Sequence, residues 1–250
     1  MVLNTVGIVL VAIQESKLQI LLQRHRDGCW GLPEQKITSE SSLDDTALNL
    51  LEKAASKVSY FRQLYTLGKA DRGKGQRKVT TFYICLTPKE NILEQDNDKN
   101  KWFTVSKDVI EQTGSIRESL LSLTDGDHVI SYRIEDKVCE NYIRKDSALL
   151  ENSAGCLYED HIKMINMAMD ELQLHVISSG LIFNLLPAEF TLKQVQNVYE
   201  IISGTKKDTP NFRRDILKML VPTGKTVKTY NREAELYSFN PLLQYLKGDL

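Results

Sequence analysis

Two amphipathic helix patterns separated by a short turn open the C-terminal stretch 190–241, and they constrain the fold more than any other feature. Thr191 is suited to cap the first helix, and Gly204 stands where a glycine of positive φ ends one. The second helix is expected to begin with Thr209 as its N-cap and Pro210 at its first helical position. The stretch therefore predicts a helix-turn-helix.

Two short β-like runs follow the helices, at 225–229 and 235–239, joined through residues 230–232. Two helices followed by a hairpin form the outline of a winged helix-turn-helix, a fold whose second helix enters the major groove of DNA. The C-terminal part of the chain is thus expected to bind double-stranded DNA.

Positive charge is concentrated in the same stretch. Residues 204–232 carry eight cations and two acids, a net charge of +6, whereas the whole chain has −1. Positive charge gathered on the second helix and the wing is typical of a surface that binds the phosphates of DNA. The alternative is an ordinary lysine-rich surface that contacts only water. The expected phosphate contacts are Lys206, Lys207, Lys225, Lys228 and Arg232, and the expected base contacts are Asn211, Arg213, Arg214 and Lys218.

The whole sequence sets wider limits. Its 250 residues allow one or two domains. No apolar run approaches the ~20 residues of a membrane span, and the N-terminus lacks a signal-peptide pattern, so we expect a cytoplasmic protein. Cys29, Cys85, Cys139 and Cys156 lack the spacing of metal ligands, and they are expected to be packing residues in a reducing compartment.

The first part of the chain reads as a mixed α/β domain. Strands are expected at 6–13, 17–23, 63–67 and 78–86, with a helix from residue 42 or 43 to about 57. Farther along, short helices are expected at 107–111 and 116–123, a hairpin from 128–134 and 137–143 turning at Glu135 and Asp136, and a helix at 160–172.

Several motifs make the chain resemble a known family. They are Trp30-Gly31-Leu32-Pro33, the run Leu185-Leu186-Pro187-Ala188-Glu189-Phe190-Thr191-Leu192, Asn211-Phe212-Arg213-Arg214, and Glu235-Leu236-Tyr237-Ser238-Phe239. With them the chain is similar to the Nudix-related transcriptional regulators. The resemblance implies a Nudix-like α/β/α sandwich at 1–157 with a hairpin insertion at about 128–144, a linker helix at 158–174, and a winged helix-turn-helix at 175–250.

The carboxylates of a Nudix hydrolase are missing. In such an enzyme, helix carboxylates hold the Mg²⁺ ions that polarise a pyrophosphate. Alignment on the W-G-L-P motif puts Gln35, Ser41, Asn49, Leu50, Lys53, Ala54 and Ser56 at the positions of the Nudix signature. A cation at Lys53 would stand where the enzyme holds magnesium. We therefore expect no hydrolysis, no catalytic residue, no bound metal and no cofactor.

The resemblance also implies that the Nudix-like domain senses a small phosphorylated metabolite, either ADP-ribose or a sugar. Arginines on loops near the expected cleft suit phosphate, and aromatic rings suit a base or sugar. The candidates are Arg24, Arg26, Arg72 and Arg77 for phosphate and Trp30 and Tyr83 for stacking. His161, at the start of the linker helix, is either a hinge that responds to pH or to the ligand, or an ordinary capping residue.

The sequence as a whole predicts a ligand-responsive transcriptional regulator, taken to be a homodimeric repressor with no membrane partner. One alternative is a Nudix-type nucleoside-diphosphate hydrolase with an unusual metal site. Another is a winged helix that binds a protein instead of DNA. The effector, the operator, the regulated genes, the sign of the ligand's effect and the role of residues 87–157 are left open by the sequence.

Overall fold

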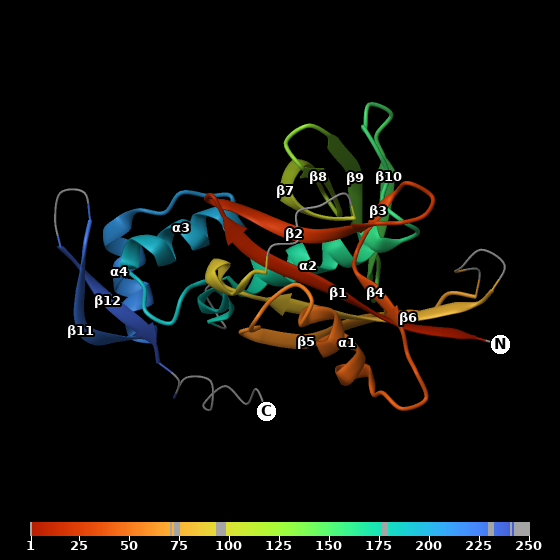
Figure 1. The fold of residues 1–250 in the computed structure, drawn as a ribbon. Helices are drawn as coiled ribbons and strands as arrows, with labels where there is room; N and C mark the ends of the chain where they lie inside the picture. Colours follow the sequence, from red (N-terminus) through yellow and green to blue (C-terminus); the bar gives the residue numbers. More distant parts are fainter. Residues whose placement is uncertain are drawn as a thin grey trace.

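One mixed β-sheet runs through most of the molecule, with helices on both of its faces and a winged helix at one end (Figure 1). The computed structural model describes residues 2–70, 72, 76–93, 99–176, 180–229, 233–240 and 242. Within the described residues, no helix is both long and apolar enough to cross a bilayer.

The sheet has ten strands, of which eight follow the order β10-β9-β8-β7-β2-β1-β6-β5. Its central pair, β1 and β6, is parallel, and the neighbouring pairs are antiparallel. Short β3 and β4 pair with β2 and β1. The strands are β1 Leu3–Gln14, β2 Lys17–Arg24, β3 Trp30–Gly31, β4 Glu34–Lys36, β5 Tyr60–Leu67, β6 Lys78–Leu86, β7 Asn100–Thr113, β8 Ile116–Thr124, β9 Val129–Val138 and β10 Ile143–Leu149.

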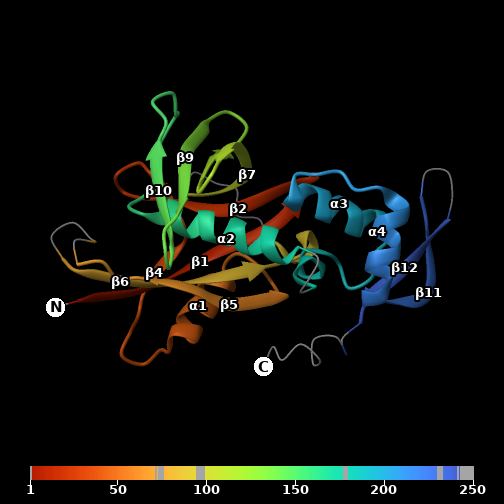
Figure 2. The same ribbon diagram turned by 180° about the vertical axis from the view of Figure 1, so that it is seen from behind.

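Helices α1 (Leu43–Leu51) and α2 (His161–His175) cover opposite faces of the central strands. Alternate residues of β1 explain this arrangement, since Ile8 packs in the α1 core and Val9 in the α2 core. Figure 2 shows α2 between the central strands and β7–β10, pointing toward α3. The α2 core continues without a break into the winged helix, so both parts share one apolar interior.

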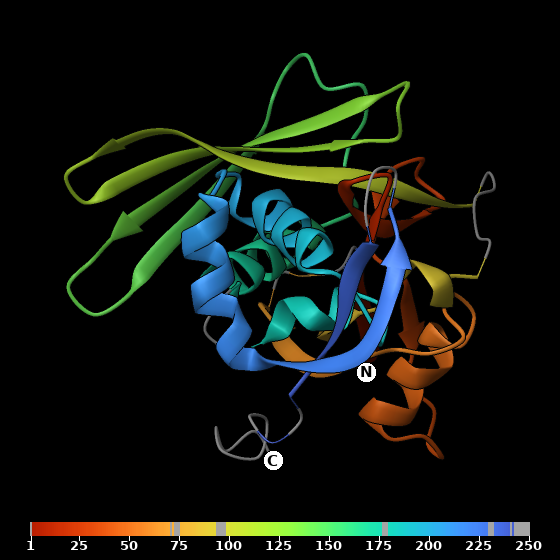
Figure 3. The ribbon, with the colours of Figure 1, turned by 90° about the vertical axis from the view of Figure 1, so that its left-hand side faces the viewer.

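The C-terminal part contains α3 (Leu192–Ser203), α4 (Thr209–Ile216) and the antiparallel wing of β11 (Leu220–Lys228) and β12 (Glu233–Phe239). Figure 3 shows α3, α4 and the wing at the same end of the molecule. A 3₁₀ helix at Leu181–Leu185 leads from α2 into this unit. The predicted helix-turn-helix and wing are therefore present, while the predicted domain boundaries stay a proposal.

The region between β6 and α2 differs from the sequence prediction. The expected helices at 107–111 and 116–123 are wrong, because both segments are strands. In β8 every second residue is buried, namely Ser119, Leu121 and Leu123. Because Ser119 is polar, the alternation of apolar and polar residues that marks a strand was not visible in the sequence. The hairpin exists as β9 and β10, but Asp136 lies inside β9, buried beside Arg117, and not in a turn.

Two further expectations need correction. Helix α1 ends at Leu51 and not near residue 57. Cys29 and Cys156 form a disulfide and are not simple packing residues. Cys85 is buried as expected, and burial raises the pKa of its thiol.

Candidate nucleic-acid interface and linker anchor

The start of α4 is fixed by its own side chains. Asp208, and not Thr209 as expected, is the N-cap, because its carboxylate accepts the backbone N–H of Asn211 at 3.3 Å. The same carboxylate also accepts the Asn211 side-chain amide at 3.0 Å. Phe212 and Ile216 are buried, which turns the cationic face of α4 toward solvent.

The turn between α3 and α4 is held by Gln196, a residue that the sequence analysis did not single out. Its side-chain amide donates to the carbonyl of Lys207 at 2.9 Å, and its carbonyl accepts the hydroxyl of Thr209 at 3.3 Å. Gln196 is only 5% exposed. Its only sequence signal is a polar residue beside the apolar stripe of α3, which is too common to be diagnostic.

The predicted DNA contacts that are described lie on the surface of α4, the preceding turn and the wing. Those that are exposed are Lys206, Asn211, Arg213, Arg214, Lys218, Lys225 and Lys228, whereas Lys207 is half-buried. Arg232 lies outside the described residues. The structure thus gathers these side chains at one end of the molecule, and their contacts with DNA remain proposals.

Some of these cations have acidic neighbours. Lys207 Nζ lies 3.2 Å from Asp215 Oδ2, and Arg214 Nε lies 3.5 Å from Asp215 Oδ1. The hydrogen bond from Lys207 holds the pKa of Asp215 below its usual range. Lys225 pairs with Glu189 at 2.7 Å. These exposed pairs are weak enough to exchange for phosphate contacts.

A groove of about 550 Å³ lies between α3, α4 and the wing. Its polar walls include Lys193, Arg213, Glu233 and Glu235. Tyr237, which also lines the groove, exchanges two backbone hydrogen bonds of 2.8 and 2.9 Å with Phe190. The sequence analysis missed Lys193 and the two glutamates, because it counted charge only over residues 204–232.

The predicted effector residues are dispersed. Arg24, Arg26 and Arg77 are exposed. The Arg24 guanidinium lies 5.6 Å from the centroid of the Trp30 ring, which itself packs edge-on against Phe103 at 5.1 Å.

Arg72 and Tyr83 are not open to a ligand in this structure, which corrects their expected placement. Arg72 is 6% exposed and paired with Asp160 at 2.8 Å. The Tyr83 ring stacks on Phe61 at 4.7 Å, and its hydroxyl donates to Asp44. Whether any of the six residues contacts an effector stays a prediction.

The positions that align with the metal ligands of a Nudix hydrolase offer an unsuitable donor set. Lys53 Nζ donates to Gln35 Oε1 at 3.3 Å, so an ammonium and an amide occupy positions where a hydrolase has a carboxylate and a glycine. Leu50 and Ala54 are buried in the α1 core. A hard divalent cation needs several oxygen ligands with negative charge, and these residues do not fit one. Among the described residues, no group of three or more His, Cys, Asp or Glu side chains is placed to hold a metal.

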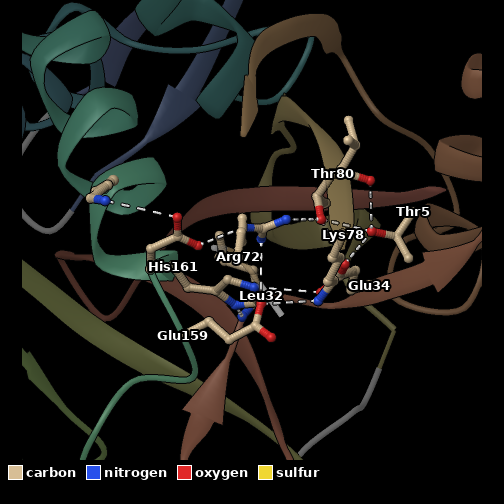
Figure 4. Close-up of polar contacts among 11 residues, drawn as sticks. Thr5, Leu32, Glu34, Arg72, Lys78, Thr80, Glu159 and His161 are labelled. Carbon is tan, nitrogen blue, oxygen red and sulfur yellow. Dashed lines mark hydrogen bonds and ion pairs between the residues drawn. The ribbon is translucent and has the colours of Figure 1, made fainter. Parts of the chain in front are cut away.

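A buried polar network anchors the start of α2 to the sheet (Figure 4). Glu34 of β4 accepts from Lys78 Nζ at 2.8 Å and from the Thr80 hydroxyl at 3.0 Å. Lys78 also pairs with Glu159 at 3.1 Å. Arg72 joins the network through Asp160 and the Thr80 hydroxyl.

His161 completes this linker anchor. Its Nδ1 accepts the backbone N–H of Leu32 at 3.0 Å, which leaves its Nε2 facing Glu34 at 3.5 Å. Burial alone would raise the pKa of Glu34, but the nearby His161 and the hydrogen-bonded ammonium of Lys78 outweigh it and hold that pKa far below its usual range. The pKa of His25 is lowered, mainly because the ring is partly buried and to a smaller extent because His161 is close. The anchor joins the W-G-L-P segment to the linker helix.

Residues 182–239 match the family model of the NrtR DNA-binding winged helix domain. This segment is similar to the DNA-binding winged helix domain of NrtR. Its bounds include α3, α4 and both strands of the wing, so the fold expected from the C-terminal motifs is confirmed.

The rest of the chain also has relatives. A curated relative described as the ADPR responsive transcriptional repressor NtrR of Acinetobacter baylyi is 23% identical over 248 residues, covering 95% of this chain and 82% of that protein. The crystal structure of Shewanella oneidensis NrtR complexed with a 27mer DNA matches with a TM-score of 0.70 and 23% identity, covering 97% of this chain and 95% of that one. A MutT/nudix family protein from Enterococcus faecalis matches with a TM-score of 0.67 and 18% identity, over 96% and 87% of the two chains. The predicted Nudix-like domain followed by a winged helix is therefore confirmed as the fold.

Proposed function

We propose that this protein is a DNA-binding transcriptional repressor whose Nudix-like domain binds a small phosphorylated metabolite of the ADP-ribose class without hydrolysing it. The observation that carries the proposal is the NrtR-type winged helix domain, whose cations on α4 and the wing face solvent. The name of the Acinetobacter relative supports both the repressor role and the effector class. A cytoplasmic location and a homodimer are parts of the same proposal. A dimer would place two reading helices about one duplex turn, ~34 Å, apart.

The first experiment tests DNA binding. Duplexes selected from a random pool by the full-length protein should contain two related half-sites, and fluorescence anisotropy should give their affinity. Arg213→Ala with Arg214→Ala should abolish binding. A matched control is Arg133→Ala with Arg144→Ala, since these exposed arginines lie on β9 and β10. Equal binding by both double variants would contradict a DNA-reading role for α4.

The second experiment tests the effector. ADP-ribose should raise the melting temperature of the full-length protein, because a ligand of the native state alone stabilises it. It should also change the affinity for the selected duplex. The alternative, a nucleoside-diphosphate hydrolase, predicts release of AMP from ADP-ribose in the presence of Mg²⁺. The contact between Lys53 and Gln35 argues against it, and AMP formation at ordinary enzyme rates would overturn the non-hydrolysing part of the proposal.

A further inference from the structure

The disulfide between Cys29 and Cys156 joins parts of the chain 127 residues apart, at the place where the linker helix meets the sheet. Cys29 precedes the W-G-L-P segment, and Cys156 lies five residues before His161, the first residue of α2. Disulfides are rare in the reducing compartment proposed for this protein, where thiol reductants cleave accessible ones. Both cysteines are half-buried and neither lies in the core.

Several contacts near the bond hold the same two segments together. Trp30 donates its backbone N–H to the Cys156 carbonyl at 3.0 Å and accepts that of Tyr158 at 2.7 Å. The rings of His25 and Tyr158 stack with centroids 3.9 Å apart. The disulfide is thus the covalent member of a short clamp formed by residues 25–32 and 156–161.

Close packing makes the clamp sensitive to small movements. A Cβ atom at Gly31 would lie 2.7 Å from His25 Nε2 and 2.8 Å from His161 Nδ1, so the two segments have no spare room. His161 is fully buried and begins α2, whose apolar face continues into the core of the winged helix. Loosening the clamp therefore acts directly on the helix that connects the two domains.

We propose that Cys29 and Cys156 are a reversible redox modification site, reduced by a dithiol, and that reduction loosens the start of α2 and weakens DNA binding. A thiolate of the dithiol attacks one sulfur, the Cys29–Cys156 bond breaks, and a mixed disulfide forms. The second thiol of the reductant then resolves the mixed disulfide. Two electrons and two protons pass to the protein as two thiols, and the dithiol becomes a disulfide.

The basic loop beside Cys29 favours this chemistry. Arg24 and Arg26 stand close to Cys29 in sequence and favour a thiolate, while Asp27 adds one opposing charge. Weaker DNA binding is expected because a loosened helix must be ordered again when both winged helices engage DNA. The DNA part of the test rests on the proposed function, whereas the structural part does not.

The test compares the full-length protein in its disulfide form with the same protein reduced by dithiothreitol. Intact mass after maleimide labelling should show two additional reactive thiols under native conditions. Hydrogen exchange of residues 157–165 should become about tenfold faster on reduction, while exchange in α1 stays the same. Affinity for a selected duplex should fall about fivefold.

Two variants separate the outcomes. Cys29→Ser should show the reduced behaviour with or without dithiothreitol, and Cys139→Ser, which removes a free and equally half-buried cysteine, should respond as the unaltered protein does. Identical exchange in the two redox forms would overturn the proposal. Faster exchange in α1 as well would also overturn it, since the bond would then be a general structural support. If neither the disulfide form nor the reduced form binds any duplex, the proposed function is wrong. The hydrogen exchange of residues 157–165 then still shows whether reduction of the disulfide loosens the start of α2.

Discussion

Glu34 of β4 and His161 of α2 face each other inside the protein, with 3.5 Å between Glu34 Oε2 and His161 Nε2. The backbone N–H of Leu32 donates to His161 Nδ1, so the ring proton belongs on Nε2, the nitrogen nearer the carboxylate. Lys78 neutralises the buried charge of Glu34. Glu34, the residue after W-G-L-P, therefore links the Nudix-like part of the chain to α2, whose apolar core continues into the winged helix.

Replacing Glu34 by alanine should destabilise the protein strongly. The change leaves the Lys78 ammonium, whose side chain is 8% exposed, without its nearest buried partner. Removing one member of a buried ion pair costs about 3–5 kcal/mol, and urea unfolding measures this loss. Glu40→Ala, at an exposed loop position, should change stability by less than about 0.5 kcal/mol. A loss for Glu34→Ala as small as that of the control would show that the network does not stabilise the fold.

The same carboxylate should control acid stability. The pKa of Glu34 is lower in the folded protein than in the unfolded chain, so below the unfolded value of about 4.3 the unfolded chain binds more protons. The stabilisation from Glu34 is therefore complete above that pH and is lost progressively as the pH falls. Unfolding free energies between pH 3 and 6 should decline less steeply for Glu34→Gln than for the unaltered protein. Parallel curves would contradict this assignment.

The winged helix was predictable because its signals are local. Thr191 forms the expected capping box with Gln194, and Gly204 has the expected positive φ of 67°. The cap of α4 was misplaced by one residue, because Asp208 and Thr209 are both good caps and the choice depends on the turn held by Gln196. The first strand of the wing was expected at 225–229, but β11 begins at Leu220 and includes Pro222 and Gly224.

The linker anchor was not predictable, because it depends on contacts between residues far apart in sequence. Arg72 looked like a loop arginine for phosphate, yet its partner Asp160 is 88 residues away. Lys78 is the first residue of a strand, where a lysine is usually exposed, and nothing in the neighbouring sequence indicates that it is buried. The disulfide escaped prediction for the same reason, since nothing near Cys29 or Cys156 indicates which cysteine the other one meets.

Loss of the Gln196 side chain should loosen the reading helix. In Gln196→Ala the Lys207 carbonyl and the Thr209 hydroxyl lose their partner. Lys207 is half-buried and Thr209 exposed, so each lost hydrogen bond should cost about 0.5–1.5 kcal/mol, and calorimetry should show this loss in the unfolding free energy. DNA affinity should fall in parallel, because α4 is no longer held in register with α3. Gln112→Ala, at the exposed end of β7, serves as the control for both measurements.

The salt dependence of DNA binding should count the phosphate contacts. If about four cations per subunit meet phosphate, a dimer releases enough counterions to give a log–log slope of roughly −7. Lys225→Ala with Lys228→Ala removes two exposed wing cations per subunit, so the slope should become shallower by about 3.6. Lys163→Ala with Lys17→Ala removes two cations that lie outside the winged helix, and it should leave the slope unchanged. An unchanged slope after the wing substitutions would place the phosphate contacts on the turn and α4 alone. If both pairs of substitutions made the slope equally shallow, the change would reflect the net charge of the protein and not phosphate contacts of the wing.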